Sequence, residues 1–129
     1  LAVEYTASPL WKGSTRIELR TPDPTANPYL ALACMLAAGL DGIKRGLTPP
    51  EPVNRNIYHL TEDESKELGI RSLPHDLSHA LDALEADDVM RQALGEHIFT
   101  EYIGLKREEW ASYNEQVHDW EIRQYMDRF

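Results

Sequence analysis

A strand, a turn and a helix are predicted to follow one another within residues 14–30, which read STRIELRTPDPTANPYL. Over residues 14–20 apolar and charged side chains alternate, and this period of two is typical of a β-strand with one apolar face. The apolar face carries Thr15, Ile17 and Leu19, and the charged face carries Arg16, Glu18 and Arg20. We therefore expect a strand that presents three charged side chains on one surface of a sheet.

The predicted turn contains two prolines within residues 21–26, which exclude both a helix and a central strand there. Asn27 followed by Pro28 is typical of an N-cap and a first helical residue. The helix is expected over residues 29–45, with Gly46 as its C-terminal cap. Because this segment is apolar nearly all round as far as Leu40, we expect the helix to be buried on most sides.

The rest of the chain is predicted to be helical, apart from a proline-rich connector at residues 47–56. Thr61 and Glu64 have the spacing of a capping box. The expected helical segments are 61–69, the region around Leu77 to Leu84, 87–95, 96–117 and 120–126. The fold class is therefore α+β and predominantly helical.

A single strand in such a chain would leave backbone groups unpaired. Residues 2–8 offer a second strand with a weaker pattern. We infer that the strand at residues 14–20 belongs to a sheet most of which lies outside these 129 residues.

The net charge of −9 is unevenly distributed. Residues 1–60 hold five acidic and six basic side chains, whereas residues 61–129 hold seventeen and seven. This balance argues against direct binding of nucleic acid or of an anionic membrane, since either needs a basic face. The chain has no apolar run of about 20 residues, which a membrane span needs, and residues 1–13 do not read as a signal peptide. With Cys34 as its single cysteine, the chain is expected in a reducing compartment, the cytoplasm.

The alternation of Arg16, Glu18 and Arg20 has two readings. It fits a structural ladder of ion pairs, and it also fits a site in which arginines bind phosphate or carboxylate while the glutamate binds a hard divalent cation. The pattern alone favours the ladder.

The wider sequence resembles the C-terminal part of a bacterial type I glutamine synthetase over residues 14–129. The strand, the turn DPTANPYL at 23–30 and the helix end AAGLDGIK at 37–44 occur together and in order. Later stretches are similar to the feedback-inhibited form typical of Gram-positive bacteria. They are NIY at 56–58, ALGEH at 93–97, QVHDWE at 116–121 and QYM at 124–126.

This resemblance implies roles for the three charged residues. Arg16 is expected to contact ATP, Glu18 to bind a Mg²⁺ or Mn²⁺ ion, and Arg20 to hold the glutamate substrate and the transferred phosphoryl group. It also implies a reaction in which glutamate and ATP form γ-glutamyl phosphate and ammonia then displaces phosphate. The metal and ATP need further residues of the family, and these lie upstream and are missing. Residues 1–13 form an atypical segment or junction that skips a phosphate-binding arginine of the family.

These departures predict that the chain alone is inactive, as a fragment or truncated homologue. The alternative is a non-catalytic helical interaction module. The resemblance implies a homo-oligomer, a dodecamer in the family, assembled through the C-terminal helix, and a contact with a nitrogen-regulatory transcription factor. Among other candidates, Tyr58 is expected to be an ordinary half-buried tyrosine, and His75 and His79 a solvated pair rather than a metal site. The aromatic residues at 110–129 fit either a core or a subunit interface.

Overall fold

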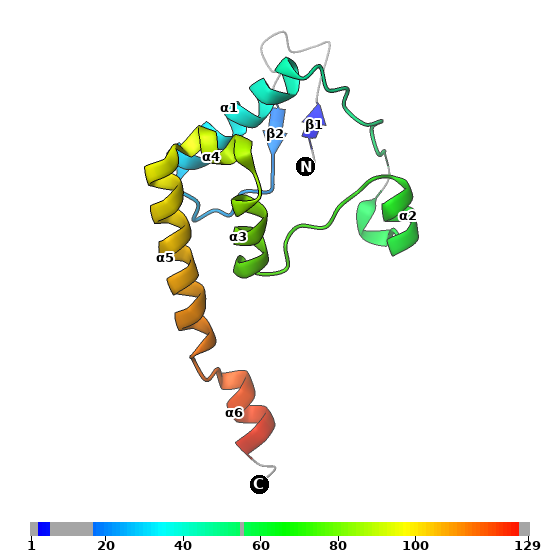
Figure 1. Cartoon of the computed structure of the whole chain (residues 1–129). Coiled ribbons are helices and arrows are strands. Elements are labelled where there is room, and N and C mark those ends of the chain that lie inside the picture. Colours follow the sequence, from blue (N-terminus) through cyan, green and yellow to red (C-terminus); the bar gives the residue numbers. More distant parts are fainter. Residues whose placement is uncertain (1–2, 6–16, 55, 127–129) are drawn as a thin grey trace.

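The computed structural model describes residues 3–5, 17–54 and 56–126. Two short strands, β1 (Val3–Tyr5) and β2 (Ile17–Leu19), pair antiparallel (Figure 1). Their register places Val3 opposite Leu19, Glu4 opposite Glu18 and Tyr5 opposite Ile17. The weaker strand expected at residues 2–8 is thus present over Val3–Tyr5. The described part of the expected 14–20 strand is β2, and residues 14–16 lie outside the described ranges.

Helix α1 (Pro28–Lys44) begins and ends where the sequence indicates. The Asn27 side chain accepts hydrogen bonds from the N–H groups of Tyr29 and Leu30, and Gly46 has a left-handed φ of +60° just after the helix. A left-handed residue at this position is typical of a helix C-terminus and favours glycine.

The expected burial of α1 is wrong for this chain. None of its residues is buried. The packed pairs of helices are α1 with α4, α3 with α5, α4 with α5 and α3 with α4. Since a neighbouring helix covers only one side of α1, the apolar residues on its other side remain exposed.

The second half consists of one 3₁₀ turn and five helices within the described residues. They are η1 (Ile57–His59), α2 (Glu62–Glu67), α3 (Leu77–Glu85), α4 (Asp88–Leu94), α5 (Glu96–Asn114) and α6 (Asp119–Tyr125). Thr61 and Glu64 form the expected capping box. The helix expected over 96–117 ends earlier, at Asn114, and α6 begins after His118.

A small core holds α3, α4 and α5 together. Leu81, Phe99 and Ile103 are the buried hydrophobic residues of the described chain. The partly buried hydrophobic side chains packed around them are Leu77, Leu84, Leu94 and Tyr102. Apolar contacts between successive helices therefore fix this unit.

One arginine also joins α3 and α5 at the edge of this core. The Arg107 guanidinium donates hydrogen bonds to the carboxylates of Asp82 and Glu85 and to the Ser78 hydroxyl. The three acceptors all lie on α3, so Arg107 fixes how α5 lies against that helix.

The C-terminal part of the chain projects away from this core. Figure 1 shows α5 running outward from α4, with α6 at its far end. The Tyr113 ring stacks on Trp110 and contacts His118, with ring centroids 5.8 Å and 4.7 Å apart, so aromatic contacts span the bend between α5 and α6. Tyr113, Trp120 and Tyr125 are each at least half exposed, and the core reading of these aromatic residues is therefore wrong for this chain. We call residues 108–126 the C-terminal arm. No helix in the described ranges is long and apolar enough to span a membrane.

We expect Leu81→Ala to lower the free energy of unfolding by about 2–5 kcal/mol, because it leaves a cavity in the small core. Chemical denaturation followed by circular dichroism measures this change. Leu105→Ala, on the exposed side of α5, is the control and should stay within about 0.5 kcal/mol of the wild type. Equal effects of the two substitutions would contradict the assigned core.

Cys34 provides a second check on the packing of α1 against α4. Burial raises the pKa of the Cys34 thiol, and the carboxylate of Asp87, the N-cap of α4, raises it further. A raised pKa lowers the thiolate fraction at pH 8, so alkylation at that pH should be slower in the folded chain than in the denatured chain. Asp87→Asn keeps a good N-cap and should increase the folded-state rate. Equal rates in folded and denatured chains would contradict this packing.

Candidate functional site

Two of the three predicted site residues, Glu18 and Arg20, lie on β2 and directly after it. Glu18 is the central residue of this strand, and Arg20 follows its last residue. Arg16 lies outside the described residues. The strand register places Glu4 directly opposite Glu18.

The turn between β2 and α1 is held by its own hydrogen bonds. The Asp23 carboxylate accepts hydrogen bonds from the Thr25 hydroxyl and from the Thr25 N–H, the latter at 2.7 Å. The Thr25 hydroxyl is the main cause, and its N–H the second cause, of a lowered pKa at Asp23. The Asp23 carbonyl accepts from the Ala26 N–H at 2.9 Å. Asp23 is therefore a structural residue that stays ionised and shapes the turn.

The N-terminus of α1 is also occupied by the chain itself. Asn27 Oδ1 accepts from the N–H groups of Tyr29 at 3.0 Å and Leu30 at 3.4 Å. These donors are used in the cap, so they do not form a phosphate-binding helix end. The groups in this segment that remain for chemistry are the charged side chains on β2 and directly after it, Glu18 and Arg20.

These side chains are too few to hold a metal ion by themselves. A hard divalent cation takes six or more oxygen ligands, several of them carboxylates. The described residues contain no group of three or more histidine, cysteine or acidic side chains that could hold a metal ion. Glu18 can supply one ligand and Arg20 one cationic group, and the remaining ligands must come from elsewhere.

His79 is held at the start of α3 by Asp76. His79 Nδ1 lies 2.8 Å from Asp76 Oδ1, and the His79 N–H donates to the same oxygen at 2.9 Å. These contacts, first the backbone N–H and then the ring, lower the pKa of Asp76. Asp76 is the N-cap of α3, so His75 precedes the helix and does not share a helical face with His79. Both histidines are exposed, which confirms the solvated reading.

Tyr58 differs from the sequence expectation. It is 90% exposed in η1, whereas we expected a half-buried side chain. The Asn56 side chain accepts from the Tyr58 N–H at 3.0 Å and fixes the turn. The core cluster on α3, α4 and α5 does not include Tyr58.

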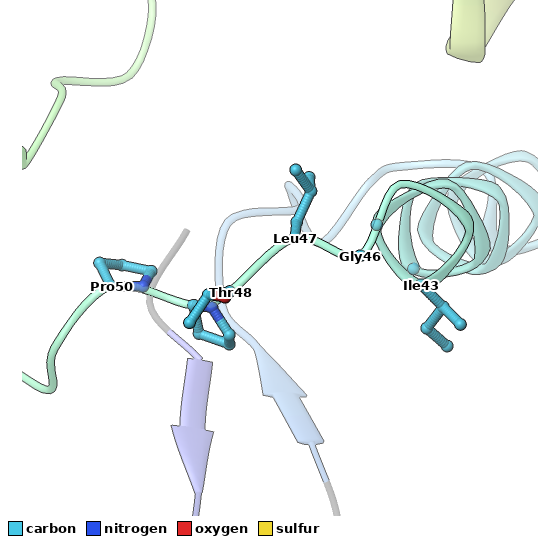
Figure 2. A pocket seen from close by; sticks show the side chains of 8 residues that line it. Ile43, Gly46, Leu47, Thr48 and Pro50 are labelled. Atoms are coloured by element: carbon cyan, nitrogen blue, oxygen red, sulfur yellow. The ribbon is translucent and has the colours of Figure 1, made fainter.

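The sequence reasoning missed a shallow apolar groove at the C-terminal end of α1. Figure 2 shows the chain leaving α1 at Gly46 and passing through Leu47 and Thr48 toward Pro50. The groove, here called the α1 groove, is lined by Gly39, Gly42, Ile43, Gly46, Leu47, Thr48, Pro49 and Pro50. Its glycines recur at helical spacing, and this is the signal that could have revealed it. Its lining has no charged group, so it suits packing rather than catalysis.

Comparison with known proteins shows one family. The model of the glutamine synthetase catalytic domain matches residues 8–125. The glutamine synthetase of Methanocaldococcus jannaschii is 58% identical over 113 residues, which are 88% of this chain and 25% of that protein. That of Staphylococcus aureus is 51% identical over 116 residues, 90% of this chain and 26% of that protein.

A solved structure shares the fold of this chain. The structure of apo GmaS without ligand is 40% identical, with a TM-score of 0.73, over 86% of this chain and 25% of that one. The chain thus spans about a quarter of the length of the relatives it matches, and it is a mostly helical part of a larger fold. From the matched residues and the shared fold we conclude that the chain belongs to the glutamine synthetase family, as a segment of the catalytic domain.

Proposed function

We propose that this chain supplies the C-terminal part of a catalytic domain that joins ammonia to glutamate at the expense of ATP. The γ-carboxylate of glutamate attacks the γ-phosphorus of ATP and ADP leaves. Ammonia then attacks the resulting γ-glutamyl phosphate, loses a proton and displaces phosphate. The observation that carries this proposal is Glu18 on β2 and Arg20 at its end, followed by the turn held by Asp23 and Asn27, within a matched catalytic domain.

Each charged residue has a chemical role in this proposal. A carboxylate suits Mg²⁺ or Mn²⁺, so Glu18 would be one ligand of a metal ion that neutralises charge on the phosphates when bound. Arg20 would bind the glutamate substrate and the transferred phosphoryl group through paired N–H donors, and Arg16 would contact ATP. Charge that concentrates on phosphoryl oxygens is best stabilised by such fixed cations.

The same proposal makes the chain inactive by itself. The metal and ATP both need ligands from the upstream part of the domain, and catalysis requires the reactants to be held in place. Residues 1–13 would be an atypical segment or junction. The single cysteine, Cys34, supports a reducing compartment, the cytoplasm. The narrower assignment to the feedback-inhibited Gram-positive form stays a prediction, since relatives from M. jannaschii and S. aureus both match at half identity or more.

The alternative, a non-catalytic interaction module, draws support from the C-terminal arm. Trp120 and Tyr125 on α6 are 64% and 50% exposed and contact each other edge to face. Exposed aromatic side chains on a projecting helix are typical of a subunit interface. In this reading the arm joins copies of the protein into an oligomer, a dodecamer in the family. The contact with a nitrogen-regulatory transcription factor stays a prediction.

Glu18→Ala tests the catalytic proposal in a full-length glutamine synthetase that carries this segment. We expect glutamine formation at moderate Mg²⁺ to fall by about 100-fold or more, because a metal ligand is lost. Raising the Mg²⁺ concentration should restore part of the rate. The measurement is the initial rate of glutamine formation as a function of Mg²⁺ concentration.

The control is Glu101→Ala, which removes an exposed carboxylate from α5 far along the chain from β2. It should leave both the rate and the Mg²⁺ dependence unchanged. If the Glu18 variant keeps the Mg²⁺ dependence of the wild type, the metal role of Glu18 is refuted.

A further inference from the structure

The connection from β2 to helix α1 is short and contains two prolines. It consists of residues 21–26, between the end of the strand segment at Arg20 and the N-cap of α1. Pro22 and Pro24 fix their own φ angles, and each keeps the residue before it out of the helical region. The prolines therefore restrict the first four residues of the connection and leave its last two to be held by other means.

Asp23 holds the two residues that the prolines leave free. Its Oδ1 atom accepts hydrogen bonds from the Thr25 N–H, at 2.7 Å, and from the Thr25 hydroxyl. Its carbonyl accepts from the Ala26 N–H at 2.9 Å, and this bond closes a β-turn. Aspartate and proline are favoured at the first two positions of the commonest β-turn, as in Asp23-Pro24. Both residues after Pro24 are thus bonded to Asp23.

This turn bears on Arg20 more directly than on Glu18. The register pairs residues 17–19 with β1, so the sheet holds the backbone of Glu18. Arg20 follows the last paired residue, and two residues separate it from Asp23. The direction of the chain at Arg20 therefore depends on the turn that follows it.

A carboxylate at Asp23 can act in two ways, as a charge or as a hydrogen-bond acceptor. One oxygen, Oδ1, accepts both bonds from Thr25. An asparagine side chain carries an oxygen at the same place and forms the same kind of turn. The local geometry thus requires an acceptor at this position and does not require a negative charge.

We propose that Asp23 is a positioning residue whose side chain, as a hydrogen-bond acceptor, fixes Arg20 relative to helix α1. The inference rests on the proposed function for the role of Arg20 in holding the glutamate substrate. It gives Asp23 no contact with substrate, ATP or metal. When the turn loosens, the Arg20 guanidinium spends less time in the geometry that binds glutamate for reaction.

The test measures glutamine formation against glutamate concentration in a full-length glutamine synthetase that carries this segment. Asp23→Ala should raise the KM for glutamate by about tenfold, because Arg20 loses its fixed position. Asp23→Asn keeps the acceptor and should stay within about twofold of the wild type. The Mg²⁺ concentration that gives half the maximal rate should change less than about twofold in both variants, because the sheet still holds the backbone of Glu18.

Asp76→Ala is the matched control for a loss of local hydrogen bonds. Asp76 Oδ1 also accepts a backbone N–H, that of His79, and lies 2.8 Å from the His79 ring nitrogen. It caps α3, far along the chain from β2. This variant should lower the midpoint of thermal unfolding at least as much as Asp23→Ala does and leave the KM for glutamate unchanged. An equal rise in KM would mean a general loosening of the fold and would overturn the inference.

Arg20→Ala separates this inference from the proposed function. Its effect is measured as the dissociation constant of glutamate by calorimetry with Mg²⁺ and ADP present, which needs no turnover. Arg20→Ala should weaken glutamate binding, and Asp23→Ala should weaken it little further in that background, because the residue that the turn positions is then absent. Unchanged binding in Arg20→Ala refutes the proposed role of Arg20. The inference about Asp23 alone is overturned if Arg20→Ala weakens binding and Asp23→Ala does not, if Asp23→Asn is as impaired as Asp23→Ala, or if the two effects add fully.

Discussion

Helix α1 must bury two apolar faces, and the packing of α4 satisfies this requirement for one of them. Burial of apolar surface is the main favourable term in folding, so a helix with a bare apolar face is incompletely stabilised. The other packed unit, α3 to α5, is secured by Leu81, Phe99 and Ile103 and by Arg107 across its edge. The chain therefore contains a small helical core of its own and an open apolar surface beside it.

This constraint also governs the candidate site. β2 pairs with one short strand, and isolated two-stranded sheets are marginally stable in water. Its connection to α1 is short and held by the Asp23 and Asn27 side chains, so the position of Glu18 and Arg20 follows that of α1. If β2 has the proposed catalytic role, its charged groups need helix α1 to be fixed, since they must lie in a defined geometry to act on a phosphoryl group.

The features that the sequence predicts well are those determined by local chemistry. The caps at Asn27 and Thr61 depend on side chains that accept hydrogen bonds from N–H groups two or three residues away, and both caps are present. The family resemblance, carried by residues 14–44 and later motifs, is confirmed at the level of the catalytic domain. The roles of Arg16, Glu18 and Arg20 stay predictions.

The features that the sequence predicts poorly depend on which other helices and strands pack against a segment in the folded chain. The apolar pattern of α1 indicates a buried helix, but burial needs a partner on each face, and the pattern does not tell whether the chain supplies both. Tyr58 is exposed for a related reason, because an aromatic residue is buried only where another element covers it. The sequence predicts the end of α5 at residue 117, three residues beyond its end at Asn114, because the pattern of apolar residues continues across the break. The cap of α6 at His118 has no common sequence signal.

We propose that this chain contributes part of a glutamine synthetase site and needs the rest of the catalytic domain for activity. The most direct measurement compares glutamine formation from glutamate, ammonia, ATP and Mg²⁺ by the purified chain and by the same chain assembled with the rest of a family catalytic domain. We expect no turnover by the chain alone and Mg²⁺-dependent turnover by the assembly. Turnover by the chain alone, at a rate comparable to that of the assembly, would contradict it.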